Sequence, residues 1–135
     1  MVTYTADAVA LLVYLVDALP NRADRVFAEA EAGETAITVP TTALAEVLYS
    51  VSRDKDVRGV TLTGTPEDAR RALVVNGPVS TTPIGDEELA EYSQVVGDFG
   101  IHDAFVVASH RARETDAVIT TDGVLHDAGV ETVWD

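Results

Sequence analysis

Apolar residues of this chain follow two alternating patterns, a helical spacing of three to four residues and short runs of residues that favour β-strands. The helical spacing predicts helices over residues 8–19, 21–31 and 42–53, and further helices that begin near residues 65, 86 and 103. The short runs predict strands over residues 2–6, 35–39, 79–84, 117–121 and 131–134. Strands that alternate with helices in this way form a parallel sheet covered by helices on both faces. The pattern therefore predicts the α/β class, with three layers.

Local signals set several helix ends. Pro20 stops the first helix, and Asn21 is expected to cap the second. Thr65-Pro66 with an acid at Asp68 predicts a capping box with proline at the first helical position. The face that each helix should bury follows from its stripe of apolar residues. For the helices beginning at residues 42 and 86, the stripes are expected to consist of Leu44, Val47, Leu48 and Val51, and of Leu89, Tyr92, Val96 and Phe99.

The bulk composition is that of one folded domain over residues 1–135. A hydrophobic fraction of 47% can fill a core, and 135 residues are too few for two ordinary domains. No apolar run reaches the roughly 20 residues that span a bilayer, and the run at residues 8–16 lacks the preceding bases of a signal peptide. The absence of cysteine excludes disulfides, thiolate catalysis and sulfur-ligated zinc. We therefore expect a cytoplasmic protein without membrane contact.

The charge balance changes this picture. The chain has 23 acidic and 9 basic residues with a formal net charge of −14, and Lys55 is its one lysine. Such a charge repels nucleic acid at low salt and would indicate another kind of partner. In molar salt, however, the Debye length falls to about 3 Å and the repulsion is screened. Dispersed acids with almost no lysine favour this second interpretation, a protein from a halophilic prokaryote.

Four acidic residues are expected to meet at one edge of the sheet. Asp7 follows the first strand and Asp122 a later one, while Glu46 lies one turn into a helix and Asp103 lies at the start of another. Each has an ordinary alternative role: a helix cap for Asp7 and Asp103, a solvated helix face for Glu46, and a turn for Asp122. Together they would gather at the carboxyl ends of parallel strands, where ligands bind. Carboxylates so close repel one another, and a hard divalent cation such as Mg²⁺ relieves the repulsion and can activate water beside a phosphate.

The segments around these acids resemble PIN-domain ribonucleases, in particular the VapC-like toxins of prokaryotic toxin–antitoxin pairs. "YTADAVALL" is similar to the family's first motif, "ITVPTTALAEVLYSV" to the segment that bears its glutamate, and "IHDAFVVASHRARETDAVITTD" to its third and fourth motifs. The resemblance covers nearly the whole chain and implies a PIN-like α/β/α fold with a central parallel sheet. It also implies a catalytic and metal-binding set of Asp7, Glu46, Asp103 and Asp122, supported by Thr120.

The resemblance further implies the chemistry and the partners. The expected activity is cleavage of RNA phosphodiester bonds by water that Mg²⁺ or Mn²⁺ activates on the four carboxylates. The expected partners are the RNA substrate, an antitoxin protein and a second copy of the chain in a homodimer. Because the chain is acidic, a few arginines near the metal edge should hold the phosphates, and the nearest in sequence are Arg53, Arg111 and Arg113. Surface salt bridging is the alternative role of each arginine.

The chain departs from the family pattern at two positions. Ala8 stands where a hydroxyl residue usually follows the first aspartate, which removes a hydrogen bond near the site and is consistent with weaker activity. Leu125 stands where a bulky aromatic is common. Asp116 precedes its strand and ranks below Asp122 as a ligand. The histidines form no helical pair with metal-ligand spacing and are expected to be non-ligands; they are His102, His110 and His126.

Three other functions compete with this interpretation. A signalling receiver domain needs a pair of acids after its first strand and a lysine after its last, whereas this chain offers Asp7 alone and has Lys55 elsewhere. A haloacid-dehalogenase-type phosphatase needs Asp-x-Asp, and residues 7–9 are Asp-Ala-Val. A PIN fold that has lost catalysis and binds RNA or protein as a scaffold is the third alternative, and it stays open because a fold does not establish an activity.

Overall fold

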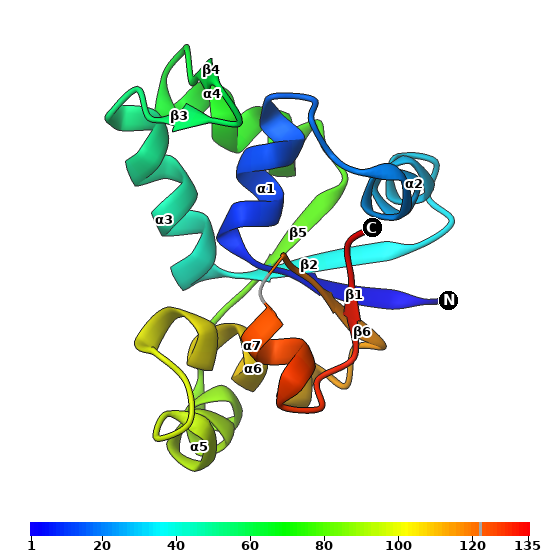
Figure 1. Cartoon of the computed structure of the whole chain (residues 1–135), viewed down its shortest axis with the longest axis vertical. Coiled ribbons are helices and arrows are strands. Elements are labelled where there is room, and N and C mark those ends of the chain that lie inside the picture. Colours follow the sequence, from blue (N-terminus) through cyan, green and yellow to red (C-terminus); the bar gives the residue numbers. More distant parts are fainter. Residues whose placement is uncertain (122) are drawn as a thin grey trace.

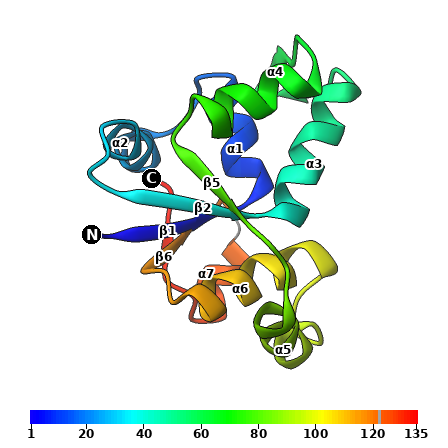
Figure 2. The same ribbon diagram turned by 180° about the vertical axis from the view of Figure 1, so that it is seen from behind.

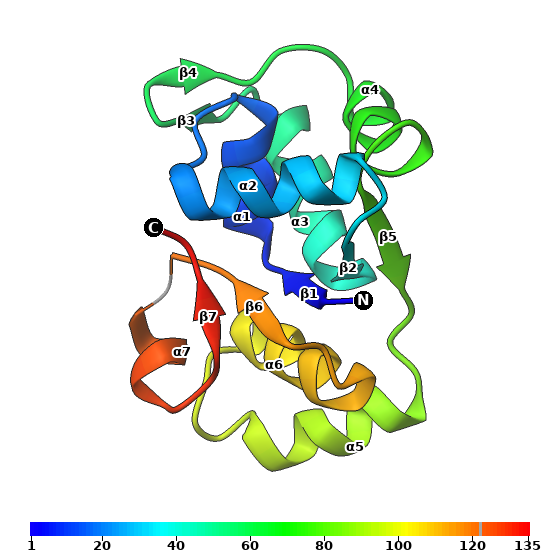
Figure 3. The same ribbon diagram turned by 90° about the vertical axis from the view of Figure 1, so that its right-hand side faces the viewer.

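The computed structural model describes residues 1–121 and 123–135, and it has three layers with a parallel sheet in the middle (Figure 1). The first face of the sheet carries α1 (Ala8–Leu15), α2 (Asn21–Glu31), α3 (Thr41–Ser52) and α4 (Pro66–Arg70). The second face carries α5 (Asp86–Val95), α6 (Ile101–Arg113) and α7 (Gly123–Asp127), as Figure 3 shows from the side. This arrangement confirms the predicted three-layer α/β/α class.

The sheet is parallel throughout. Its strands are β1 (Thr3–Ala6), β2 (Ala36–Pro40), β5 (Val79–Thr82), β6 (Ala117–Ile119) and β7 (Thr132–Val133). They lie in the order β5-β2-β1-β6-β7, and Figure 2 shows β5 running beside β2 at one edge. The central strand β1 pairs with β2 through Thr3 and Ala36, and with β6 through Ala6 and Ile119.

The strand order fixes where the chain reverses its direction across the sheet. From β1 the chain moves outward to β2 and β5, and it then crosses to β6 on the other side of β1. Such a reversal opens a crevice at the carboxyl ends of the two flanking strands, here β1 and β6. Numbered in chain order, the strands of this sheet are arranged 3-2-1-4-5, whereas receiver domains have the order 2-1-3-4-5. The fold therefore excludes the receiver alternative.

A small antiparallel hairpin between α3 and α4 was not predicted from the sequence. It consists of β3 (Asp56–Val57) and β4 (Val60–Thr61). Its two turn residues, Arg58 and Gly59, both have positive φ, at 54° and 81°. Two such residues form the tight turn whose twist matches paired strands. The segment was missed because each strand is too short to show alternation.

The predicted capping box at the start of α4 is confirmed. The Asp68 N–H donates to Thr65 Oγ1 at 3.1 Å, and the Thr65 N–H donates to Asp68 Oδ2 at 3.0 Å. The helix continues as a wider π-helical turn over Arg71–Val75. At its end, a β-carbon on Gly77 would lie 2.0 Å from the carbonyl oxygen of Ala72. Glycine is therefore needed here because the backbone approaches the helix end so closely.

Helix ends differ from the sequence predictions in three places. Helix α1 ends at Leu15 rather than at residue 19, because the chain turns back through Asp17, whose φ is 55°. Asn21 is the first residue of α2 and does not cap it, since Pro20 occupies the cap position. Helix α6 begins at Ile101, two residues before the predicted start.

The predicted buried face of α5 is wrong in part. Leu89 and Val96 are exposed, at 47% and 38%, while Glu88 is 3% exposed. Glu88 turns inward because its carboxylate accepts the N–H of Gly85 at 2.8 Å and thereby closes the start of its own helix. The helix stops at Val95, so the later residues of the predicted stripe lie beyond it. The stripe of α3 is better predicted, since Leu44, Val47 and Val51 are buried and Leu48 is partly buried.

The core lies between the sheet and both helical layers. Its fully buried side chains include Leu11 of α1, Ile37 of β2, Val107 of α6 and Ile119 of β6. Burial of each such side chain contributes about 1.5–3 kcal/mol. Within residues 1–121 and 123–135, no helix combines the length and the apolarity that crossing a membrane requires.

Candidate functional site

The carboxyl ends of β1 and β6 bring Asp7 and Thr120 into neighbouring positions. Ala6 and Ile119 are paired in the sheet, and the N–H of Asp7 extends this pairing by donating to the Ile119 carbonyl at 3.2 Å. Thr120 is 3% exposed and its N–H donates to the carbonyl of Val133 at 3.2 Å. The crevice expected from the strand order is therefore flanked by two residues that the sequence analysis selected.

A cleft with a volume of about 60 Å³ opens at this edge of the sheet, which we call the acid cleft. It is bounded by residues from α1, α3 and α6 together with Asp7, and they are Asp7, Ala8, Val9, Ala43, Glu46, His102, Asp103 and Val106. Three of the four predicted acids thus line one cleft although they are distant in sequence. The fourth, Asp122, lies outside the described residues.

Asp7 caps α1 and is nearly buried. Its carboxylate accepts the N–H of Ala10 at 2.8 Å, and the residue is 7% exposed. The capping role proposed as its ordinary alternative is therefore real. It does not compete with a role in the cleft, because a carboxylate has two oxygens and about four lone-pair sites.

Asp103 lies in the first turn of α6 without capping it. The cap position belongs to Gly100, three residues before the predicted start of the helix. A negative charge in the first turn is stabilised by the positive end of the helix dipole. Asp103 is half-buried and lines the acid cleft, so α6 presents a carboxylate to the carboxyl edge of the sheet.

Glu46 reaches the cleft from α3 and contacts His102. The contact joins Glu46 Oε1 to His102 Nδ1, with the side chains 34% and 65% exposed. The sequence analysis expected His102 to be a non-ligand and assigned it no role, yet it lines the cleft beside Asp103. Its position next to Asp103 in the first turn of the helix was the signal that pointed to this edge.

The donor set of the cleft suits a hard divalent cation. Carboxylate oxygens are the ligands that Mg²⁺ and Mn²⁺ take in proteins, and the cleft offers them from three separate elements. Among the described residues, no three acidic or histidine side chains converge into a ready-made cage for an ion. Such a cage is not required for Mg²⁺, which retains several waters and binds through one or two carboxylates.

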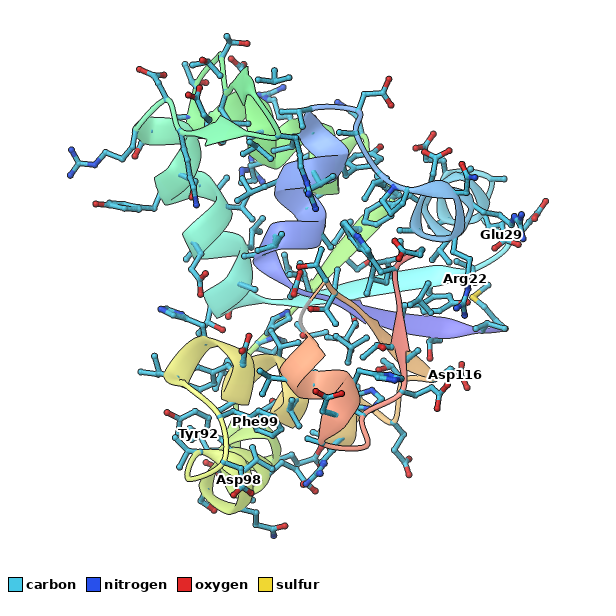
Figure 4. All side chains as sticks on the ribbon, viewed as in Figure 1. Arg22, Glu29, Tyr92, Asp98, Phe99 and Asp116 are labelled. Carbon is cyan, nitrogen blue, oxygen red and sulfur yellow. The ribbon has the colours of Figure 1, made fainter. Side chains whose placement is uncertain are left out.

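The other acids and histidines of interest lie away from the cleft. Asp116 stands at the amino end of the sheet (Figure 4), where its carboxylate accepts the N–H of Thr3 at 2.8 Å. His110 Nδ1 lies 2.7 Å from Thr115 Oγ1, and burial lowers the pKa of this histidine. His126 Nδ1 lies 3.4 Å from Thr132 Oγ1. Each of these three side chains therefore has a polar partner outside the acid cleft.

Of the three predicted arginines, only Arg53 lies near the cleft. It borders a hollow that also contains Glu46 and His102, and its guanidinium carbon lies 5.2 Å from the centre of the Tyr49 ring. Arg111 and Arg113 are eight and ten residues beyond Asp103 on α6, about 12 and 15 Å along the helix axis. Arg111 borders a hollow with Glu87, and Arg113 faces Glu88 at 3.9 Å.

Sequence reasoning overlooked Tyr49, which borders the same hollow as Arg53. Glu46 and Tyr49 stand at positions i and i+3 of α3, and Arg53, which caps the C-terminal end of the helix, follows at i+7, so the three share one face. That face is opposite the buried stripe of α3. The helical period was therefore a signal that could have added Tyr49 to the candidate residues.

Comparisons with known proteins show the fold. No family model matches the chain, and no curated protein matches its sequence. Three solved structures are similar over almost their whole length. VapBC2 from Rickettsia felis, bound to a DNA fragment from its promoter, has a TM-score of 0.72 at 13% identity and covers 98% of this chain and 99% of that one. VapC20 from Mycobacterium tuberculosis, a toxin that cleaves the sarcin–ricin loop, has a TM-score of 0.68 at 17% identity with the same coverage. FitAcB from Neisseria gonorrhoeae has a TM-score of 0.61 at 16% identity and covers 96% and 95%.

The fold implied by the sequence resemblance is therefore confirmed. The chain has the PIN-like α/β/α fold of VapC toxins along nearly its full length. TM-scores of 0.72 and 0.68 establish this architecture, whereas identities of 13% and 17% leave the activity to be argued from the residues of the cleft.

Proposed function

We propose that this chain is a metal-dependent endoribonuclease and the toxin of a toxin–antitoxin pair. The observation that carries the proposal is the acid cleft, which Asp7, Glu46 and Asp103 line together at the reversal point of the sheet. The fold supports it, because VapC20, which shares this fold, is a toxin that cleaves RNA at the sarcin–ricin loop. Asp122, two residues after Thr120 in the sequence, belongs to the proposed ligand set, with Thr120 supporting it.

The proposed cofactor is Mg²⁺ or Mn²⁺, held by the carboxylates of the acid cleft. When bound, such an ion activates water and neutralises the charge that develops on a phosphate. The chain itself positions the ligands. The Ala10 N–H fixes one oxygen of Asp7, and His102 holds Glu46 at the mouth of the cleft. Ala8 provides no hydroxyl at the cleft wall, so the hydrogen bond usual in this family has no donor there.

An antitoxin is the proposed protein partner. The VapBC2 structure is a complex bound to promoter DNA, and the present chain matches it over 98% of its residues. A DNA-binding antitoxin would cover the toxin until released. A homodimer of the toxin remains part of the proposal, and sedimentation of the purified chain tests it.

Single-turnover cleavage of total RNA in concentrated KCl with Mn²⁺ tests the activity. Asp103→Asn should reduce cleavage more than about 100-fold, since loss of even an outer partner of a metal ligand costs 10–100-fold. Asp24→Asn is the matched control, because Asp24 is an exposed aspartate in the first turn of α2. EDTA should abolish cleavage by the wild type.

Equal cleavage by wild type and Asp103→Asn would identify a contaminating nuclease and refute the proposal. RNA binding without any metal-dependent cleavage would instead favour the non-catalytic scaffold. Because both variants replace one aspartate by asparagine, a general effect of net charge would appear equally in Asp24→Asn.

A further inference from the structure

A hollow with a volume of about 450 Å³ lies between α3 and α6, next to the acid cleft. Its walls are mainly apolar and include Tyr49 of α3 and Ile101 and Phe105 of α6. Tyr49 is 62% exposed and Ile101 is 57% exposed. The ring of Phe105 stacks on the ring of Tyr92 of α5, which Figure 4 labels, with ring centroids 4.2 Å apart. One wall of the hollow is therefore a packed pair of aromatic rings, and the ring of Tyr49 beside it is exposed.

The hollow is continuous with the acid cleft. Glu46 and His102 line both spaces, so a molecule in the hollow would lie beside the carboxylates. A second hollow of about 430 Å³ shares Glu46, Tyr49 and His102 and adds Ser50, Arg53 and Lys55. Tyr49 thus stands between an apolar space on one side and two basic side chains on the other.

The basic side chains of this second hollow are available to a ligand. Elsewhere Arg70 and Arg71 pair with Glu67, and Arg113 faces Glu88. Among the described residues, no carboxylate lies within ion-pair distance of Arg53 or Lys55. Among the described residues, the exposed Arg22, Arg25, Arg58 and Arg111 also have no carboxylate within ion-pair distance. What distinguishes Arg53 and Lys55 is that they line one hollow with Glu46 and His102, beside the candidate site, and this position favours an anionic ligand there.

The spacing along α3 places these groups in a line from the acid cleft. Tyr49 and Arg53 follow Glu46 by three and seven residues, about 5 and 10 Å along the helix axis. The guanidinium of Arg53 lies over the Tyr49 ring, which restricts both side chains. Proteins that bind single-stranded nucleic acids combine an aromatic ring, on which a base stacks, with a nearby cation that contacts a phosphate.

We propose that the two hollows form a nucleotide subsite for single-stranded RNA, in which Tyr49 stacks on a base and Arg53 with Lys55 holds a neighbouring phosphate. This inference rests on the proposed ribonuclease function and names how its substrate is bound. Stacking uses the face of the ring, so the subsite accepts any base and does not itself select a sequence. An acidic peptide would also meet Arg53 and Lys55, but its affinity would not depend on bases.

The test is equilibrium binding in EDTA, where metal-dependent cleavage is suppressed. The probes are fluorescent single-stranded oligoadenylate and an abasic ribose-phosphate oligomer of equal length. Tyr49→Ala should weaken oligoadenylate binding about tenfold and leave the abasic oligomer unaffected. Tyr49→Phe keeps the ring and should restore binding. Because Tyr49 is mostly exposed, its replacement should leave the melting temperature unchanged.

Arg53→Ala should weaken both probes equally and reduce the slope of log K against log salt by about 0.7. Arg25→Ala, at an exposed position of α2, is the matched control and should keep the wild-type slope. Unchanged oligoadenylate binding by Tyr49→Ala, or equal loss for both probes, would overturn the subsite and indicate a protein-binding hollow. Metal-dependent cleavage by the wild type is measured separately, so the ribonuclease proposal can stand while the subsite fails.

Discussion

At Asp7, the role of the side chain as a helix cap can be separated by mutation from its proposed role as a metal ligand. Its carboxylate accepts the Ala10 N–H at 2.8 Å and also borders the acid cleft. Asparagine caps helices about as well as aspartate, whereas alanine does not. Asp7→Asn therefore keeps the cap and removes the charge, and Asp7→Ala removes both.

The two variants should differ in stability before any metal is added. Loss of the cap costs about 1 kcal/mol, which lowers the melting temperature by about 3–5 °C in a chain of this length. In EDTA, Asp7→Asn should unfold at the wild-type temperature or above it, because it removes one of the like charges of the cleft. Asp7→Ala should unfold below it.

Added Mg²⁺ or Mn²⁺ should then raise the melting temperature of the wild type but not that of either Asp7 variant. An ion at 100 times its Kd stabilises the folded state by about 2.7 kcal/mol, and this gain requires the shared carboxylates. We expect the gain in wild type and in the control Asp24→Asn, and its loss in both Asp7 variants, measured by thermal unfolding in concentrated KCl. An equal metal-induced increase in Asp7→Asn and wild type would refute a shared ion site that includes Asp7.

Three further predictions concern stability. Cooperative unfolding should require concentrated KCl or NaCl, because the 23 acidic residues, with only 9 basic residues to offset them, repel one another when screening is weak. An unchanged unfolding midpoint in dilute buffer would refute the halophilic interpretation. Thr42→Val should stabilise the fold by about 1 kcal/mol in denaturant titrations, since Thr42 Oγ1 is buried without a hydrogen-bond partner among the described residues. Burial, with a smaller effect of Arg111, lowers the pKa of His110, so the folded state favours the neutral ring. Stability should therefore be complete above about pH 6.5 and fall as the pH drops from there through the folded pKa, and His110→Gln should reduce this loss between pH 7.5 and 5.5.

Much of the fold could be predicted because the central elements are strongly patterned. Strands β1, β2 and β6 and helices α3 and α6 lie within a few residues of the predicted ranges. The alternation of strands and helices also implied that Asp7 and Glu46 approach the same sheet edge. This inference needed only the direction of parallel strands, which the sequence pattern supplies.

The surface elements were predicted less well because their energetics depend on tertiary contacts. The burial of Glu88 reflects a hydrogen bond to Gly85 and the nearby Arg113, neither of which is visible in a hydrophobic pattern. The Glu46–His102 pair joins two helices, so no local spacing reveals it. The ligand role assigned to Asp122 lies outside the described residues and stays a prediction.

The three predicted arginines differ in whether the helix that carries them brings them close to an acid of the cleft. Helix α6 carries Asp103 in its first turn and Arg111 and Arg113 in its last, an arrangement that the helix dipole favours at both ends. The same arrangement separates these charges by most of the helix length. Along α3, by contrast, Tyr49 and Arg53 follow Glu46 by three and seven residues, which places Arg53 on the same face as Glu46. In this acidic chain, the helical period thus brings Arg53 to the same hollow as the carboxylate of Glu46, whereas Arg111 and Arg113 at the end of α6 stay apart from Asp103.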